Sequence, residues 1–216
     1  MCSSDLWTAL NKMQANAEEE LKKLWMDQSD TRQRARAVQL LARIKGKEDS
    51  YVQAAMRDGD PDLSVTGIRM ARELKLPLET YLQHLVPSPN AQVRRECAIA
   101  LRHSESTMAP TLWAQLALRY DGKDRWYLEA LGIGADKQED KYFATWLKTV
   151  KDDWNTPAGR DIVWRSRATN SVPLLVKLIT AKDATAADKD KYMRALDFIS
   201  GPAKEAALVE IATGGL

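Results

Sequence analysis

The sequence predicts an all-α fold, an α-solenoid of about a dozen short helices. Apolar residues recur at helical spacing along most of the 216 residues. No stretch shows sustained alternation with a period of two, which a half-buried strand requires. Most of the eight prolines fall where a short helix is expected to begin. Together these observations favour many short helices joined by tight turns.

The helical stripes follow one another along the chain, and each covers one face of a short helix. The stripes are Ala37, Leu40, Leu41 and Ile44; Leu112, Trp113, Leu116, Ala117 and Tyr120; Tyr142, Phe143, Trp146, Leu147 and Val150; Leu174, Leu175, Leu178 and Ile179; and Tyr192, Ala195, Leu196 and Ile199. Before them, the stretch from Trp7 to Met26 predicts one long helix that packs along the first repeat or joins it to something upstream.

Prolines and small polar residues mark the helix starts. Asp60, Ser88 and Thr156 each precede a proline, where a side-chain oxygen can cap the first turn. Pro87 is expected in a linker. The prolines expected in first turns are Pro61, Pro77, Pro89, Pro110, Pro157, Pro173 and Pro202.

Three stretches share a pattern of residue types, which indicates internal repeats. Residues 29–46, 58–77 and 88–104 each place a polar turn before a helix that contains small residues. The period drifts around thirty residues, which fits HEAT-like antiparallel helix pairs better than ankyrin or tetratricopeptide repeats. We expect Gly67, Ala71, Ala98 and Ala100 to let neighbouring helices approach closely, within one repeat domain over 27–216.

Composition excludes several classes of protein. The chain has 32 basic and 30 acidic residues, so it lacks the basic excess that most nucleic-acid binders use. Its two cysteines cannot build a disulfide framework or, by themselves, a zinc site. No apolar run approaches the roughly 20 residues that span a bilayer. We therefore expect no cofactor, metal, membrane or nucleic-acid partner for this segment.

Isolated candidates for chemistry have simpler interpretations. His84 and His103 are expected at helix ends, and Cys97 on an apolar stripe inside the core. The stretch GIGADK (132–137) lacks the third glycine and the preceding strand of a dinucleotide-binding loop.

A group of arginines and aromatic residues is the main candidate for a partner-binding site. Arginine beside aromatic residues is typical of interface hot spots, but the same residues can stabilise contacts between repeats through cation–π stacking. Both interpretations remain open at this stage. The residues are Arg125, Trp126, Tyr127, Arg160, Trp164, Arg165 and Arg167.

A nucleic-acid enzyme is an alternative function. Some HEAT-like DNA glycosylases hold DNA on such a surface, with a catalytic aspartate beside tryptophans. Asp124 and Asp161 are the aspartates with that neighbourhood. The near-neutral charge argues against this function.

From about Asp58 to Ala212, the chain resembles a known setting of HEAT repeats. The stretches that carry the resemblance are DPDLSVTGIRMAREL, QVRRECAIALRH, LALRYDGKDRWYLEALGIGA and DIVWRSRATNSVPLLVKLI. They are similar to the helical-repeat region of large exported planctomycete-type proteins, which join a sugar-dehydrogenase-like propeller to HEAT repeats and a c-type cytochrome domain. The resemblance implies a non-catalytic scaffold between redox modules in a periplasmic or other extracytoplasmic place. CxxCH and propeller motifs are missing here, so any redox chemistry would lie outside these residues. A stand-alone cytoplasmic protein-interaction module is the other alternative.

Both ends of the sequence suggest a piece of a longer protein. Residues 1–6, MCSSDL, resemble the translated end of a short-read sequencing adapter, which implies that Cys2 has no role. This fragment begins without the charged n-region and apolar h-region of a signal peptide. The final helix lacks the polar outer face of a capping repeat. We therefore expect the last two helices to be less protected than those near residues 90–130.

Overall fold

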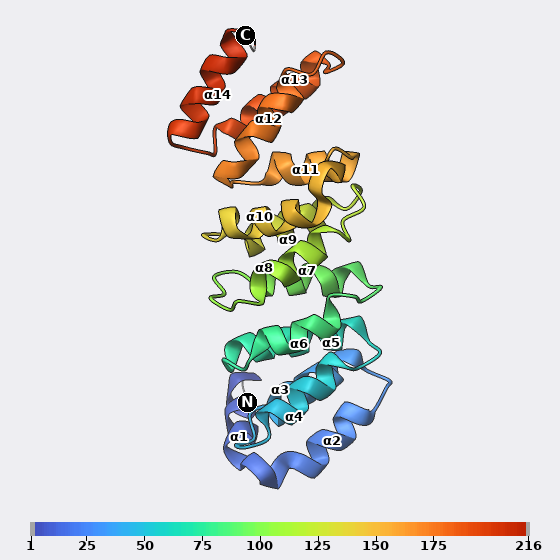
Figure 1. Cartoon of the computed structure of the whole chain (residues 1–216). Coiled ribbons are helices and arrows are strands. Elements are labelled where there is room, and N and C mark those ends of the chain that lie inside the picture. The colour runs from blue at the N-terminus through green and yellow to red at the C-terminus, as the bar shows by residue number, and fades with distance from the viewer. Residues whose placement is uncertain (1–2, 215–216) are drawn as a thin grey trace. The chain divides into compact units, whose positions relative to one another are not determined.

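The computed structural model describes residues 3–214, and every regular element in this range is a helix (Figure 1). This confirms the predicted all-α fold class. The helices divide between two compact units, Met1–Ala100 and Leu101–Leu216.

In the first unit, alternate helices stack on one another in sequence order. Helix α3 contacts α5, and α5 contacts α7, while α4 and α6 pack beside α5. The elements of this unit are α1 (Ser3–Met13), the 3-10 helix η1 (Gln14–Ala17), α2 (Glu18–Met26), α3 (Thr31–Leu41), α4 (Glu48–Met56), α5 (Pro61–Glu73), α6 (Leu78–Leu85) and α7 (Ala91–Ala100).

In the second unit, the same alternation produces two rows. Helix α8 contacts α10, and α9, α11 and α13 contact in turn, while α12 packs on α13 and α14. The elements are α8 (Ala109–Ala117), α9 (Arg125–Gly134), α10 (Glu139–Val150), η2 (Lys151–Trp154), α11 (Pro157–Arg165), η3 (Thr169–Ser171), α12 (Val172–Ile179), α13 (Ala186–Leu196) and α14 (Pro202–Ala212).

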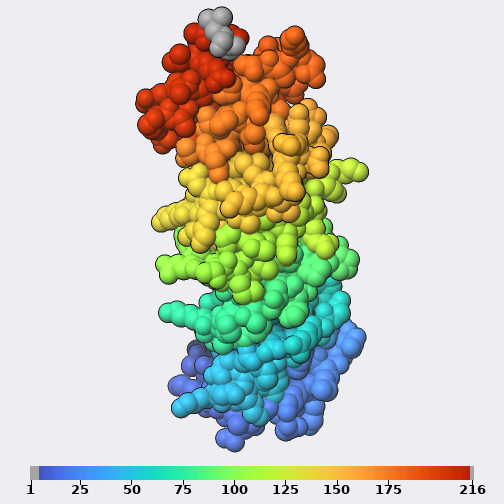
Figure 2. Space-filling model, viewed as in Figure 1, coloured from blue at the N-terminus to red at the C-terminus, as the bar shows by residue number. Residues whose placement is uncertain are grey.

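This packing is compatible with the predicted solenoid inside each unit. A helix contacts its sequence neighbour and the next helix but one, as stacked helix pairs do. Figure 2 shows that, within each unit, the colours follow one another in bands with little mixing of distant segments. Contacts are therefore made mainly between neighbouring repeats.

The N-terminal segment is not one long helix, so the helix predicted from Trp7 to Met26 is wrong. Gln14 has a left-handed φ of 49° and starts the 3-10 turn that separates α1 from α2. The Gln14 side chain donates to the carbonyl of Arg43 at 3.3 Å and accepts from the backbone of Lys45 at 2.9 Å. These contacts with the turn after α3 compensate for the interruption. The predicted packing on the first repeat is confirmed for α2, which contacts α3. Cys2 lies outside the described residues.

A buried carboxylate ties α2 to α4. Glu18 is only 7% exposed and accepts hydrogen bonds from Lys47 and Tyr51. These two donors lower the pKa of Glu18 to about 2, although burial opposes the shift. The carboxylate therefore stays charged inside the first unit.

Two of the three predicted helix caps are confirmed. Asp60 accepts from the backbone of Asp62 at the start of α5, and Thr156 accepts from Gly159 at the start of α11. Ser88 does not cap α7, because that helix begins at Ala91. Asn90 accepts from the backbones of Gln92 and Val93 instead.

Small residues allow close helix approach, as predicted. A Cβ on Gly67 would lie 2.7 Å from the Met56 side chain and 2.9 Å from its backbone nitrogen, so α5 meets α4 almost backbone to backbone. Cys97 is fully buried on α7, and burial raises the pKa of its thiol to about 12, which confirms its place in the core.

Polar side chains also connect positions one repeat apart. In the first unit, Arg43 binds Glu73, Arg69 binds Glu96 and Gln92 donates to Asp62, with separations of 30, 27 and 30 residues. In the second unit, Arg102 binds Asp136 and Lys191 binds Asp161, 34 and 30 residues apart. The period of about thirty residues read from the sequence therefore reappears as a set of side-chain contacts.

The Gly67→Ala variant should lose about 1–3 kcal/mol of unfolding free energy, because the added methyl group forces α4 and α5 apart. Urea denaturation followed by far-UV circular dichroism measures the loss. Gly59→Ala is the matched control, since a Cβ there meets nothing within 4 Å. Equal stability of the two variants would show that the close approach of α4 and α5 is not needed.

Amides of α14 should exchange with solvent faster than those of α9. Helix α14 buries Ala207, while Leu208 and Val209 are 38% and 64% exposed, so few apolar contacts oppose its local opening. Native-state hydrogen exchange followed by mass spectrometry compares the two helices in one sample. Protection of α14 equal to that of α9 would contradict this expectation.

Candidate functional site

The predicted arginine and tryptophan residues lie mainly on α9 and α11, which form one row with α13. Each of these helices has a side-chain cap at its start, Asp124, Thr156 and Thr185 respectively. The caps fix where each helix begins, and the helical spacing then places Arg125 near Trp164 and both Arg125 and Arg165 at Glu129. Arg167 follows α11 in the connection to η3.

Trp164 is at the centre of this row. Its indole Nε1 donates to the carbonyl of Lys191 at 3.0 Å, which joins α11 to α13. The guanidinium of Arg125 lies 5.2 Å from the ring centroid, and the Lys191 ammonium lies at the same distance. Both distances are within the range of cation–π attraction. Trp164 thus connects three helices.

Glu129 joins the same helices through charge. Its carboxylate accepts from Arg125 on its own helix and from Arg165 on α11, each at 2.8 Å. Burial raises the pKa of Glu129, but the two arginines outweigh it, and the pKa lies below its ordinary value. Glu129 is therefore ionised wherever the fold is intact near neutral pH.

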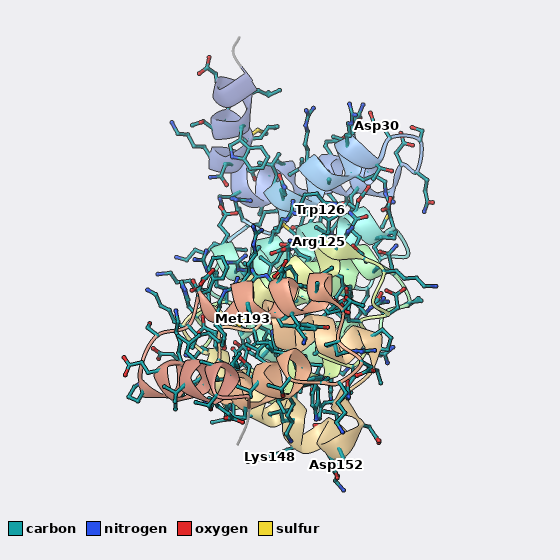
Figure 3. The ribbon with its side chains drawn as sticks, turned by 90° about the horizontal axis from the view of Figure 1, so that it is seen from above. Asp30, Arg125, Trp126, Lys148, Asp152 and Met193 are labelled. Carbon is teal, nitrogen blue, oxygen red and sulfur yellow. The ribbon has the colours of Figure 1, made fainter. Side chains whose placement is uncertain are left out.

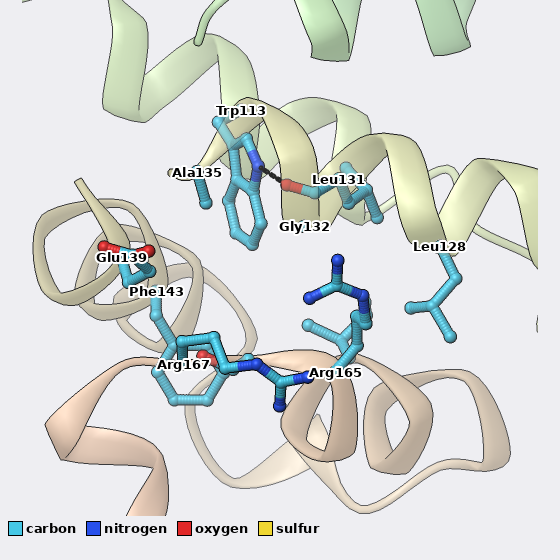
Figure 4. A pocket seen from close by; sticks show the side chains of 11 residues that line it. Trp113, Leu128, Leu131, Gly132, Ala135, Glu139, Phe143, Arg165 and Arg167 are labelled. Carbon is cyan, nitrogen blue, oxygen red and sulfur yellow. Dashed lines mark hydrogen bonds between the residues drawn. The ribbon is translucent and has the colours of Figure 1, made fainter. Parts of the chain in front are cut away.

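Gly132 makes room for Arg165. A Cβ at Gly132 would lie 2.3 Å from the Arg165 guanidinium carbon, so the guanidinium rests on the bare backbone of α9. Figure 4 shows Arg165 reaching toward Gly132, beside the hydrogen bond from Trp113 to Leu131. The GIG stretch thus lies inside α9, where Gly132 leaves room for the Arg165 side chain.

Tyr127 does not belong to a surface site, and its placement among the candidate partner-binding residues is wrong. The side chain is 1% exposed, and its hydroxyl donates to the carbonyl of Leu116 at 2.9 Å. Its helical position turns it toward the core, where its ring packs against Tyr120. Trp126, the adjacent residue, is 72% exposed and lies beside Arg125 (Figure 3).

The two remaining arginines lie in different surroundings. Arg160 lines a small cleft with Lys177 and Tyr192. Arg167 stacks on Phe198, with its guanidinium carbon 3.9 Å from the ring centroid. The seven candidate residues therefore do not form one continuous binding surface.

Both candidate catalytic aspartates have structural partners. Asp124 caps α9 by accepting from the backbone of Tyr127. Asp161 accepts from Lys191 at 2.8 Å and from the Tyr120 hydroxyl at 3.3 Å. These contacts account for both carboxylates as helix-positioning groups.

His103 has partners that its local sequence does not reveal. It follows α7 with a left-handed φ of 61°, and its Nε2 lies 2.9 Å from Asp136, which also binds Arg102. Arg102 and His103 lower the pKa of Asp136. The available signal was the repeat period, because Asp136 lies 33 residues after His103. His84 occupies the last turn of α6, as predicted.

Within residues 3–214, no three His, Cys, Asp or Glu side chains gather as a metal site would require. None of the helices in that same range is long and apolar enough to cross a membrane. No protein-family model matches the chain, and no curated protein matches it.

The Glu129→Gln variant should lose about 1–2 kcal/mol of unfolding free energy, because Arg125 and Arg165 lose a shared carboxylate. Because folding lowers the pKa of Glu129, its contribution is present above the unfolded-state pKa of about 4.3 and lost as pH falls through the folded pKa. Urea denaturation at pH 7 and pH 3 measures both effects. The control is Glu105→Gln, an exposed residue of the same unit. A loss that persists unchanged at pH 3 would contradict a role for the Glu129 charge.

Proposed function

We propose that this chain is a HEAT-like helical-repeat scaffold, a non-catalytic segment of a larger extracytoplasmic dehydrogenase–cytochrome protein. The observation that carries the scaffold function is the set of polar contacts between positions 27 to 36 residues apart. Such contacts hold successive repeats in register and stiffen the stack. The larger protein is proposed from the sequence resemblance.

The use of the charged groups supports a scaffold over a nucleic-acid enzyme. Asp124 and Asp161 are engaged with a helix start and with Lys191. Arg125 and Arg165 share Glu129, which leaves fewer cations for phosphate contacts. An aspartate that must act as a general base needs an open cleft and a reacting group within reach.

The open reading frame that surrounds this segment tests whether the segment belongs to a larger dehydrogenase–cytochrome protein. We expect a CxxCH motif within roughly a few hundred residues downstream, since covalent haem attachment needs both thiols. A natural stop codon directly after Leu216 would exclude a downstream cytochrome. A labelled-DNA mobility assay tests the enzyme alternative in parallel, and we expect no shift even at low salt. A salt-sensitive shift would contradict the scaffold function and favour the enzyme alternative.

A further inference from the structure

An open groove of about 890 Å³ runs along α13 and the end of α11 in the second unit. Trp164 and Phe198 supply its aromatic surface, and Phe198 is 64% exposed. Large apolar side chains exposed in a groove are a common mark of an interaction site. The charged residues of its lining are Arg167, Asp190, Lys191, Arg194 and Asp197.

Among the residues that the structure describes, Arg167 lacks the ion-pair partner that two neighbouring cations have. Lys191 is paired with Asp161, and Arg165 is paired with Glu129, each at 2.8 Å. Across residues 5–214, the structure shows no carboxylate in ion-pair contact with Arg167, although its side chain is half-buried. Burial and the nearby charge of Arg165 lower the pKa of Arg167. The charges of Glu129 and Glu139 oppose this shift, but neither carboxylate forms an ion pair with Arg167. An anion that enters the groove would therefore meet a guanidinium without a direct ion-pair partner in the described part of the chain.

The geometry of Arg167 suits a carboxylate beside an apolar group. Its guanidinium stacks on Phe198 at 3.9 Å, and a stacked guanidinium keeps its N–H groups at the edge available for bidentate hydrogen bonds. An apolar side chain next to the bound carboxylate would lie along Phe198 and Trp164.

The rest of the lining limits what can bind. Asp190 on α13 and Asp197, directly after that helix, place two carboxylates in the same groove. The lining thus combines three cations with two carboxylates, which suits a ligand with one carboxylate and apolar groups better than a chain of phosphates. The charge pattern therefore favours a protein segment over a nucleic acid.

We propose that this groove binds a short segment of a partner protein in which one Asp or Glu lies next to an aromatic or aliphatic residue. The carboxylate binds Arg167, and the apolar residue packs on Phe198 and Trp164. The proposal rests on the proposed scaffold function, because it names the kind of partner that the scaffold holds.

An array of octapeptides tests the proposal. Each peptide carries a single central Glu flanked by varied apolar residues, and each has a twin with Gln in place of Glu. The full chain should bind a subset of the Glu peptides at least about fivefold more tightly than their twins, a difference of about 1 kcal/mol. Fluorescence anisotropy with the best peptide then measures the variants.

Arg167→Gln should remove the preference for Glu over Gln, while Phe198→Ala should weaken both twins equally. Arg160→Gln is the matched control, since it removes a half-buried arginine of α11 that lies outside this groove. Far-UV circular dichroism checks that each variant is folded, and Arg167→Lys, expected to keep part of the preference, replaces Arg167→Gln if that variant unfolds.

The proposal is overturned if no Glu peptide exceeds its twin, or if Arg160→Gln lowers binding as much as Arg167→Gln. Tighter binding of a single-stranded oligonucleotide than of any peptide, lost in Arg167→Gln, would also overturn it. None of these peptide results alters the reading-frame test, so the two proposals can fail separately.

Discussion

Each helix buries only part of its surface against its own partner, so every repeat depends on its neighbour. This dependence explains why glycine occurs at two of the contacts between helices. Gly67 brings the backbones of α4 and α5 together, and Gly132 leaves space for a guanidinium between α9 and α11. Where backbones approach so closely, a single methyl group is enough to disturb the contact.

Ion pairs also connect neighbouring repeats. Arg43, Arg69 and Arg102 each reach a carboxylate about one repeat away, and Glu129 serves two arginines at once. Exposed ion pairs contribute little one at a time. Repeated at the same interval, they favour one register of the helices over others, which an apolar surface alone does not specify.

The arginine and tryptophan residues of the second unit come from one sequence pattern but have different functions in the structure. Trp164, Arg125 and Arg165 are largely engaged in holding α9, α11 and α13 together. Arg167 is not engaged in this way, and it meets Phe198 in an open groove. Binding of a partner therefore depends on residues such as Arg167, whose side chains do not hold one helix against another.

The sequence by itself determined the all-α class, the approximate repeat period, the core positions of Trp113, Trp146 and Cys97, and the caps at Asp60 and Thr156. These features follow from local periodicity and from residues close in the chain. The break at Gln14, the burial of Tyr127 and the pairs of Glu129 and His103 were decided only by tertiary structure. Each depends on a partner outside its own helix, and helical spacing cannot tell which side of an amphipathic helix a particular neighbour will cover.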